Sequence, residues 1–389
     1  MSAGTAPRVD SALRPDSFPP PDAVLENLLR TGVAHGFPGL AVWIESPDGR
    51  VRAAAAGSSD LLRSTPLRID DAFHLASVTK AFTAVAVLRL VDEGKLSLEA
   101  TIADLLGAEV AALPHAERIT VAQLLDHSSG LNATNNDPDY LATVIGLQAD
   151  PARVWTPAEM IALAAKGEPA GLPGTGHHYS DTSYVLLGRI VERVSGRPFQ
   201  RYVAETLFVP LGLRSTWFYS GFVVPGHAPP PRETVRGYLL ATPELRQVIA
   251  IHPGFLLVPG VVRVEGELLD TTLAAERLDT AGGIVSTLPD LARFASALFR
   301  GRLLSPASQR FLLAVGEGME SEPLGKTRIR TLEAVRKPHG LVLFKSGDGP
   351  GGVNTLMAYR PGTGEIVLGF TNVFGVGGEL DFFLDELMK

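Results

Sequence analysis

The sequence predicts an α+β fold in which helices flank an antiparallel sheet and a mostly helical region is inserted between the strands. Three observations lead to this prediction. A helix pattern followed by a hairpin pattern occupies residues 22–57, a second hairpin pattern occupies 354–372, and the region between them is mostly helical. Because antiparallel strands pair through short turns, strands from the two ends of the chain can share one sheet.

The first elements follow a loose arm. Residues 1–21 are rich in Pro, Ser and Ala, a composition that favours disorder. Apolar residues then recur at helical spacing until Gly36, where we expect the helix to end: Val24, Leu25, Leu28, Leu29 and Val33. The stretch GLAVWIESPDGRVRAAAAG predicts two strands joined by a turn at 47–49.

The patterns in the middle of the chain predict mainly helices. Residues 77–93 predict a helix that begins at Ser77, and an amphipathic helix after residue 180 ends at Gly196. Residues 222–270, rich in Pro, Gly and Val, show no clear pattern. The stretch STLPDLARFASALFRG predicts a helix capped by Ser286 or Thr287, with Pro289 in its first turn.

The end of the chain reads as a strand, a hairpin with its turn at 361–364, and a helix at 381–389. We therefore divide the chain into three parts. These are the arm at 1–21, a discontinuous sheet domain formed by 22–80 and 235–389, and a mostly helical domain at 81–234.

Composition excludes several classes of function. The 389 residues contain no cysteine, which excludes disulfides, thiol catalysis and cysteine-ligated metals. The net charge of −7 argues against nucleic acid or an anionic membrane surface as a partner. The chain contains no run of about 18 apolar residues and no secretory signal pattern at its start. We therefore expect no membrane contact and a cytoplasmic protein.

Ser77 and Lys80 form the first candidate site. Residues three apart on a helix are neighbours, so the lysine could accept the serine proton and activate the hydroxyl as a nucleophile. The helix N-terminus would also favour developing negative charge. The alternative is an ordinary helix start with one solvated lysine.

Two further motifs contain candidate residues. Tyr179, in YSD just before a helix, could serve as a base beside a lysine, although the same residues could simply cap the helix. Lys345, Ser346 and Gly347 end an apolar strand, where glycine lets a substrate approach the backbone and the side chains could hold an anionic or carbonyl group. The alternative there is an ordinary strand exit.

Other patterns argue against competing chemistries. GDGPGG at 347–352 matches a dinucleotide loop, but a strand-like stretch follows it instead of a helix. The nine histidines are scattered, without metal-binding spacing, and His127 reads as a structural loop residue. No G-x-S-x-G elbow occurs, which argues against an α/β-hydrolase. We therefore expect neither a cofactor nor a metal.

In this order, S-x-x-K, Y-S-[ND] and K-[ST]-G resemble the motifs of the serine β-lactamase and penicillin-binding protein superfamily. Within it, the chain is most similar to the branch of class C β-lactamases, DD-peptidases and family VIII esterases. The resemblance extends from about residue 22 to 389 and implies the β-lactamase/transpeptidase-like fold, with the site between the sheet and the helical domain.

The resemblance also implies roles for the motif residues. Ser77 would be the acylated nucleophile, and Lys80 and Tyr179 would share the proton transfers. The K-S-G residues would line the substrate strand. The backbone N–H groups of Ser77 and Asp348 would form the oxyanion hole.

The chain departs from the superfamily pattern at two positions. Asp181 replaces the usual Asn, and an ionised Asp would pair with Lys80 and hold its proton, which favours Tyr179 as the base. Asp348 replaces a small neutral residue next to the expected oxyanion hole. Both changes argue against efficient β-lactam turnover, whereas Lys345 with Ser346 keeps the option of binding a carboxylate.

These observations predict a serine acyl hydrolase or acyltransferase that acts on small-molecule esters or amides through an acyl-Ser77 intermediate. Water, an amine or an alcohol would accept the acyl group. Two alternatives stay open. One is a DD-peptidase, penicillin-binding protein or β-lactamase, and the other is a non-catalytic binding protein on the same fold.

Overall fold

The computed structural model describes residues 22–134, 137, 140, 155–222, 234–240, 262–263, 268–270, 279–314, 326–349 and 351–374. The predicted arm at 1–21, the predicted helix at 381–389 and most of the unassigned stretch 222–270 lie outside these residues.

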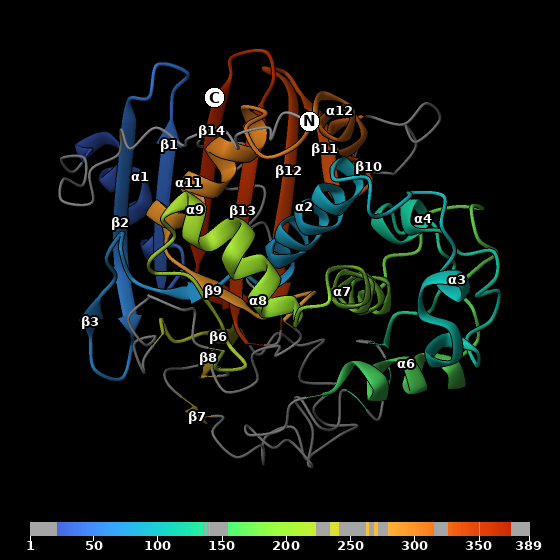
Figure 1. Ribbon diagram of the computed structural model, residues 1–389. Coiled ribbons are helices and arrows are strands. Elements are labelled where there is room, and N and C mark those ends of the chain that lie inside the picture. Colours follow the sequence, from blue (N-terminus) through green and yellow to red (C-terminus); the bar gives the residue numbers. More distant parts are fainter. Residues whose placement is uncertain are drawn as a thin grey trace.

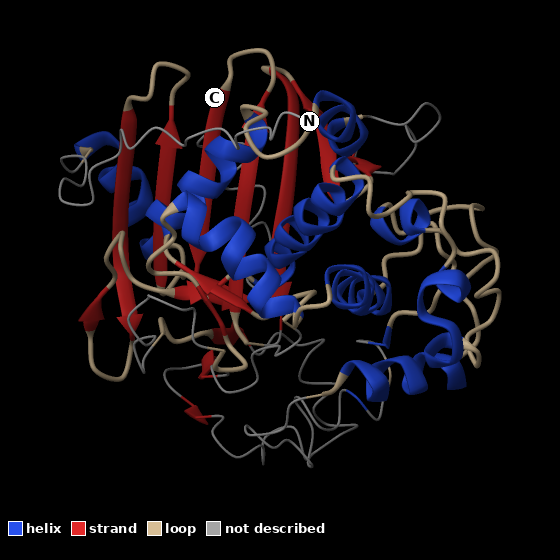
Figure 2. Cartoon of the chain, viewed as in Figure 1, coloured by secondary structure: helices blue, strands red, loops and turns tan. Residues whose placement is uncertain are grey.

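An eight-stranded antiparallel sheet forms the centre of the molecule (Figures 1 and 2). Its strand order is β10-β11-β12-β13-β14-β1-β2-β3. In that order the strands span Lys326–Ile329, Leu332–Lys337, Gly340–Gly349, Val353–Arg360, Glu365–Thr371, Gly39–Glu45, Val51–Asp60 and Thr65–Pro66. Strands from the two ends of the chain are neighbours, because β1 pairs with β14 and places Leu40 opposite Thr371. The predicted α+β class and the shared antiparallel sheet are confirmed.

The sheet has more strands than the local sequence patterns predict. The hairpin of β10 and β11 was missed because LEAVRK is half charged and too short to read as a strand by itself. In the structure β11 pairs with the first half of β12, from Glu333 opposite Phe344 to Lys337 opposite Gly340. Strand preference depends on such neighbours more than on the segment's own residues.

Helices cover both faces of the sheet (Figure 1). Helix α1 (Ala23–Ala34) packs Leu25 and Leu29 against one face, together with Val42 and Phe344 of the strands. The other face is covered by α11 (Leu288–Phe299) and, at the entry of the chain into the helix, by α2 (Thr79–Asp92). The helices α8 (Phe199–Val203), η4 (Ala204–Phe208) and α9 (Val209–Leu211) pack on α2 and α11, and α12 (Pro306–Leu313) packs on α2. As predicted, Thr287 caps α11 and accepts a hydrogen bond from the Asp290 N–H at 3.4 Å.

A group of helices lies beside the sheet, at the right of Figure 1. It contains α3 (Ile102–Leu106), η2 (Gly107–Val110), α4 (Val121–Leu125), α6 (Pro157–Lys166) and α7 (Asp181–Ser195). Helix α7 ends at Gly196, whose φ of 67° is left-handed, as expected for a helix-ending glycine. The proposed domain boundaries stay a prediction.

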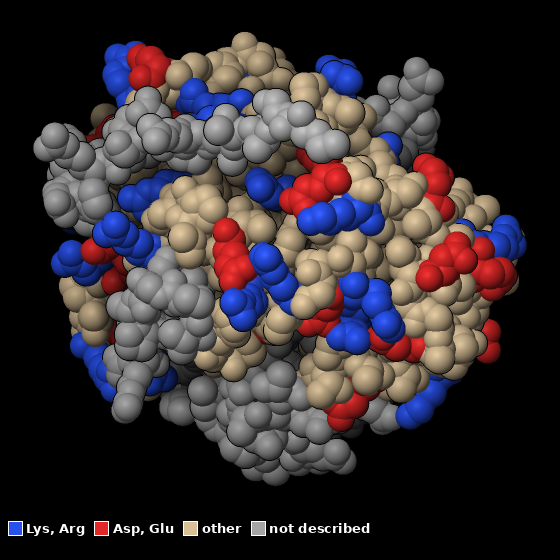
Figure 3. Space-filling model, in the orientation of Figure 1, with Lys and Arg blue, Asp and Glu red and all other residues tan. Residues whose placement is uncertain are grey.

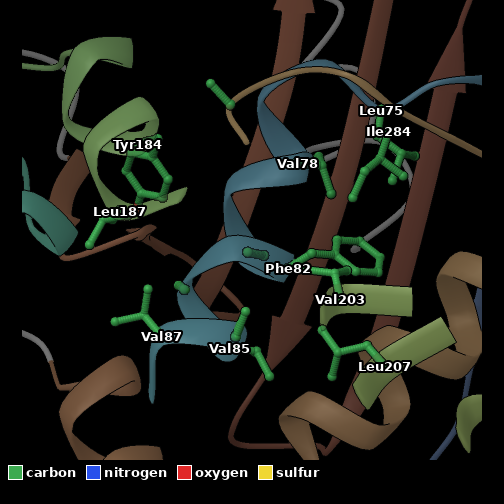
Figure 4. Packing of buried hydrophobic residues seen from close by; sticks show 14 of the residues in the cluster. Leu75, Val78, Phe82, Val85, Val87, Tyr184, Leu187, Val203, Leu207 and Ile284 are labelled. Atoms are coloured by element: carbon green, nitrogen blue, oxygen red, sulfur yellow. The ribbon is translucent and has the colours of Figure 1, made fainter. Parts of the chain in front are cut away.

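Helix α2 is the central helix of the larger core. Eleven of its fourteen residues are buried, so it is apolar on almost every side and has no solvent face. Figure 4 shows Tyr184 and Leu187 of α7 on one side of α2, and Val203 and Leu207 on the other. Phe82 stacks on Phe294 of α11 with ring centroids 3.6 Å apart. The start of α2 is therefore held by packing on several sides.

The helix predicted to begin at Ser77 begins two residues later. Residues Ala76–Val78 form a 3₁₀ turn, η1, and the α-helix starts at Thr79. The difference arises because η1 packs against β12 and β13, which tightens the entry to the helix. The spacing argument still holds, since residues three apart are also neighbours on a 3₁₀ turn.

Two smaller sheets complete the described fold. One has the strand order β4-β9-β5, spanning Phe73–His74, Ile284–Ser286 and Trp217–Phe218. The other has the order β15-β6-β8-β7, spanning Val373–Phe374, Tyr238–Leu240, Leu268–Asp270 and Val262–Arg263. Strand β4 leads directly into η1, so the first small sheet sets the position from which the chain enters α2.

Lysine and arginine side chains are interspersed with aspartate and glutamate on the face shown in Figure 3. That face has no large patch of one sign. In the part of the chain that the structure describes, none of the helices combines the length and the apolar character needed to cross a bilayer.

Candidate active site

Ser77 lies at the entrance to α2, after a strained residue. Ala76 has a φ of 45°, a left-handed conformation that costs a non-glycine residue roughly 1–2 kcal/mol. This turn redirects the chain from β4 into η1. Such strain is kept only where the surrounding packing enforces it, and it is concentrated at functional sites.

Two polar side chains converge on the Ser77 hydroxyl. The Lys80 ammonium donates to Ser77 Oγ at 2.9 Å, and the Tyr179 hydroxyl donates to the same oxygen at 2.7 Å. Lys80 comes from the same helix, whereas Tyr179 comes from the chain just before α7. A serine hydroxyl becomes a nucleophile when an adjacent group takes up its proton, and both side chains lie within hydrogen-bond distance for that role.

Lys80 is fully buried and surrounded by acceptors. Its Nζ lies 2.5 Å from Asp181 Oδ1, 2.9 Å from Ser77 Oγ and 3.0 Å from the Ala281 carbonyl oxygen. An ammonium group has three N–H donors, and three acceptors match them. The predicted pairing of Lys80 with Asp181 is present in the structure.

The two residues before Ala281 are held in place by hydrogen bonds. The carbonyl of Thr280 accepts a hydrogen bond from Thr83 Oγ1 at 2.7 Å. Asp279 Oδ2 accepts hydrogen bonds from Gln200 Nε2 at 2.7 Å and from Ser220 Oγ at 2.5 Å. Burial raises the pKa of the Asp279 carboxyl. The loop therefore holds the Ala281 carbonyl at a fixed position relative to Lys80.

Tyr179 is positioned by His127, which contacts both its ring and the backbone of the next residue. The ring stacks on buried His127 with centroids 4.4 Å apart. His127 has a φ of 59°, and its Nδ1 accepts a hydrogen bond from the Ser180 N–H at 3.2 Å. Ser180 occupies the N-cap position of α7, but its hydroxyl donates to the Asn132 carbonyl at 2.7 Å instead of capping the helix. The capping alternative for this motif is therefore wrong for the Ser180 side chain.

The ammonium groups of two lysines lie near the Tyr179 ring. Lys80 Nζ is 5.0 Å and Lys345 Nζ is 5.1 Å from the ring centroid. Tyr184, the other tyrosine near Lys80, is fully buried; burial strongly raises the pKa of its hydroxyl, which donates to Thr331 Oγ1 at 2.8 Å. Tyr184 is a structural neighbour of the site that stays neutral.

Strand β12 passes the serine at its open edge. Pairing with β11 stops at Phe344, whereas pairing with β13 continues to Gly349, so residues 345–349 have a strand neighbour on one side only. Gly347 is buried against η1, and a Cβ there would lie 2.2 Å from the Leu75 carbonyl oxygen and 2.9 Å from the Ser77 nitrogen. Only glycine fits this contact.

The other predicted residues of this strand lie around Gly347. Lys345 is buried and Ser346 is half-buried, while Asp348 is exposed near the end of the strand. Lys345 Nζ lies 3.2 Å from Glu333 Oε1 on β11. Sequence reasoning missed Glu333 because it missed β11. The alternation of buried Leu332 and Ala334 around Glu333 is the signal that could have revealed the strand.

The structure thus brings Ser77, Lys80, Tyr179 and Asp181 into one hydrogen-bonded and ionic cluster, with the strand 345–348 alongside. Among the described residues, no group of three or more histidine and acidic side chains has the arrangement of a metal site. The site is a serine, a tyrosine and two lysines, each lysine paired with a carboxylate.

The comparisons with known proteins agree with this arrangement. A family model described as Beta-lactamase matches residues 25–385, and the chain belongs to that family. The family predicted from the three motifs is confirmed.

Relatives with different names share this family resemblance. Esterase EstB of Burkholderia gladioli is 31% identical over 293 residues, which cover 70% of this chain and 73% of that protein. Penicillin-binding protein 4* of Bacillus subtilis (strain 168) is 26% identical over 288 residues, covering 73% and 57%, and penicillin-binding protein 4 of Amycolatopsis lactamdurans is 32% identical over 190 residues, covering 47% and 45%. The matches thus span about half the length of these two penicillin-binding proteins.

A solved structure extends the comparison to the fold. D-amino acid amidase from Ochrobactrum anthropi SV3, complexed with L-phenylalanine, superimposes with a TM-score of 0.76 at 24% identity. The superposition covers 94% of this chain and 98% of that chain. At this identity the likeness concerns the fold.

Proposed function

We propose that this protein is a serine acyl hydrolase that cleaves small-molecule esters or amides through an acyl-Ser77 intermediate. The observation that carries the proposal is the convergence of Tyr179 and Lys80 on Ser77 Oγ, at 2.7 Å and 2.9 Å. Such contacts allow a serine proton to leave as the oxygen attacks a carbonyl carbon.

Tyr179 is the proposed base. In this proposal the Tyr179 phenolate oxygen accepts the Ser77 proton while Oγ forms a bond to the substrate carbonyl carbon, with the ammonium groups of Lys80 and Lys345 beside the ring. Lys80 keeps its proton because Asp181 and two further acceptors surround it. The oxyanion that develops is bound by the backbone N–H groups of Ser77 and Asp348 in this proposal.

The second half of the reaction reverses the proton transfers. Tyr179 returns its proton to the leaving alcohol or amine as the tetrahedral intermediate collapses to acyl-Ser77. A water molecule then attacks the acyl carbon, Tyr179 accepts the water proton, and the carboxylic acid leaves as Ser77 regains its hydrogen. An amine or alcohol in place of water would make the protein an acyltransferase by the same steps.

The test is the mass of the intact protein after brief mixing with p-nitrophenyl acetate. We expect a transient gain of one acetyl group that is absent from Ser77→Ala. Ser59→Ala is the matched control, because it removes a hydroxyl that, among the described residues, donates to the Thr65 carbonyl and lies outside the candidate site. No acetyl adduct on the unmodified protein, or an adduct that survives Ser77→Ala, would refute the proposal.

A penicillin-binding protein or β-lactamase activity is the second candidate. It is favoured by Lys345, a cation next to Tyr179, and Ser346 on the open strand, since together they could bind a substrate carboxylate. A long-lived penicillin adduct on Ser77 would favour this candidate over the esterase or amidase.

A further inference from the structure

The charges around the candidate site are already balanced. Lys80 is paired with Asp181 and Lys345 with Glu333, at 2.5 Å and 3.2 Å. Among the described residues, each lysine of the site therefore has its own carboxylate. Asp348, exposed near the end of the same strand, adds one more negative charge at the edge of the site.

The Lys345–Glu333 pair is shielded from water. The Lys345 side chain is 3% exposed and the Glu333 side chain 20% exposed. Charges that are largely removed from water interact more strongly and are screened less by salt than surface charges. The negative charge of Glu333 therefore acts on any group that approaches Lys345 Nζ.

A substrate carboxylate at Lys345 would meet two obstacles. It would have to share the ammonium with Glu333, and the two carboxylates would then be close together in a poorly solvated place, where like charges repel strongly. A neutral ester or amide meets neither obstacle, because it leaves the ion pair intact.

We propose that Glu333 is a specificity-determining residue, which neutralises Lys345 so that the site selects esters and amides with no carboxylate near the scissile bond. This inference rests on the proposed function for its substrate class. It gives β11, through Glu333, a role in substrate selection in addition to the catalytic cluster around Ser77.

The experiment compares two probes that differ by one charge, benzylpenicillin and its methyl ester. Their dissociation constants are measured by titration calorimetry on full-length Ser77→Ala protein, which cannot be acylated at Ser77. Glu333→Gln is then added, because the amide keeps the shape of the side chain and removes its charge. Glu365→Gln is the matched control, since Glu365 pairs with Arg360 at 2.9 Å on the same sheet, on β14 and β13.

We expect Glu333→Gln to raise the affinity for benzylpenicillin relative to its methyl ester about tenfold, the effect of about 1.4 kcal/mol. Glu365→Gln should leave this ratio unchanged, and Lys345→Met added to Glu333→Gln should abolish the gain. An unchanged ratio, an equal gain for both probes, or no penicillin binding to the Gln variant overturns the inference. Because binding is measured without acylation, failure of the proposed hydrolysis is detected separately in the acetylation experiment.

Discussion

The close contact between Gly347 and η1 predicts that adding one methyl group at residue 347 strongly lowers activity while the protein stays folded. In Gly347→Ala the new Cβ would lie 2.2 Å from the Leu75 carbonyl oxygen, whereas real Cβ contacts do not fall below 3.0 Å. Strand β12 and η1 must therefore separate by at least 0.8 Å, the difference between these two distances. The same Cβ would be 2.9 Å from the Ser77 nitrogen, so the shift moves the nucleophile relative to the substrate strand.

The size of the effect follows from this displacement. A misplacement of about 1 Å costs roughly 100-fold in rate, so we expect kcat/KM to fall about 50-fold, or about 2.3 kcal/mol. The assay is p-nitrophenyl acetate hydrolysis, with the thermal midpoint measured in parallel. Gly349→Ala is the matched control on the same strand, because a Cβ there would meet no atom of the described residues within 4 Å. A folded Gly347→Ala protein with kcat/KM within twofold of the parent value would refute the reasoning.

Three further predictions concern the groups around the serine. Tyr179→Phe removes the hydroxyl at 2.7 Å from Ser77 Oγ but keeps the ring, so the acylation rate should fall by about 10²–10⁴-fold at an unchanged thermal midpoint; a smaller loss would exclude Tyr179 as the base. Asp181→Asn leaves the buried Lys80 charge without its carboxylate and should lower the free energy of unfolding in urea by about 3 kcal/mol. Adding Lys80→Met should recover part of this loss, and a neutral single variant would contradict the ion pair. The folded-state pKa of Asp279 is raised above its ordinary value of 3.8, so the free energy of unfolding should fall as the pH rises above that value. The Asp279→Asn protein should lack this part of the decline. A difference in unfolding free energy between the parent and Asp279→Asn that does not change with pH would contradict the prediction.

The strongest patterns in the sequence correctly predicted the large elements. Helical spacing identified α1 and α7, and turn residues identified the β1–β2 and β13–β14 hairpins, because these signals come from residues close together in the chain. The β10–β11 hairpin and the 3₁₀ turn at Ser77 were missed. Both are produced by packing against β12, which local patterns do not contain.

The sequence by itself determined which side chains can react and the contact between Ser77 and Lys80. Ser77 and Lys80 are three residues apart, so any helical turn places their side chains together. The order of the three motifs also predicted the family, and comparison with the family pattern revealed the departure at Asp181. These conclusions need only residue identity and local spacing.

Tertiary structure alone decided which carboxylate pairs with Lys345 and how Tyr179 lies against the serine. Tyr179 reaches Ser77 across 102 residues of sequence, and Lys345 meets Glu333 across a strand pairing that local preference does not predict. The sequence favoured Tyr179 as the base, and its contact with Ser77 Oγ supports that choice, whereas Glu333 as specificity residue depends on tertiary contacts entirely. The physical reason is that a charged group's behaviour is set by the charges and the burial around it, and packing brings those neighbours from distant parts of the chain.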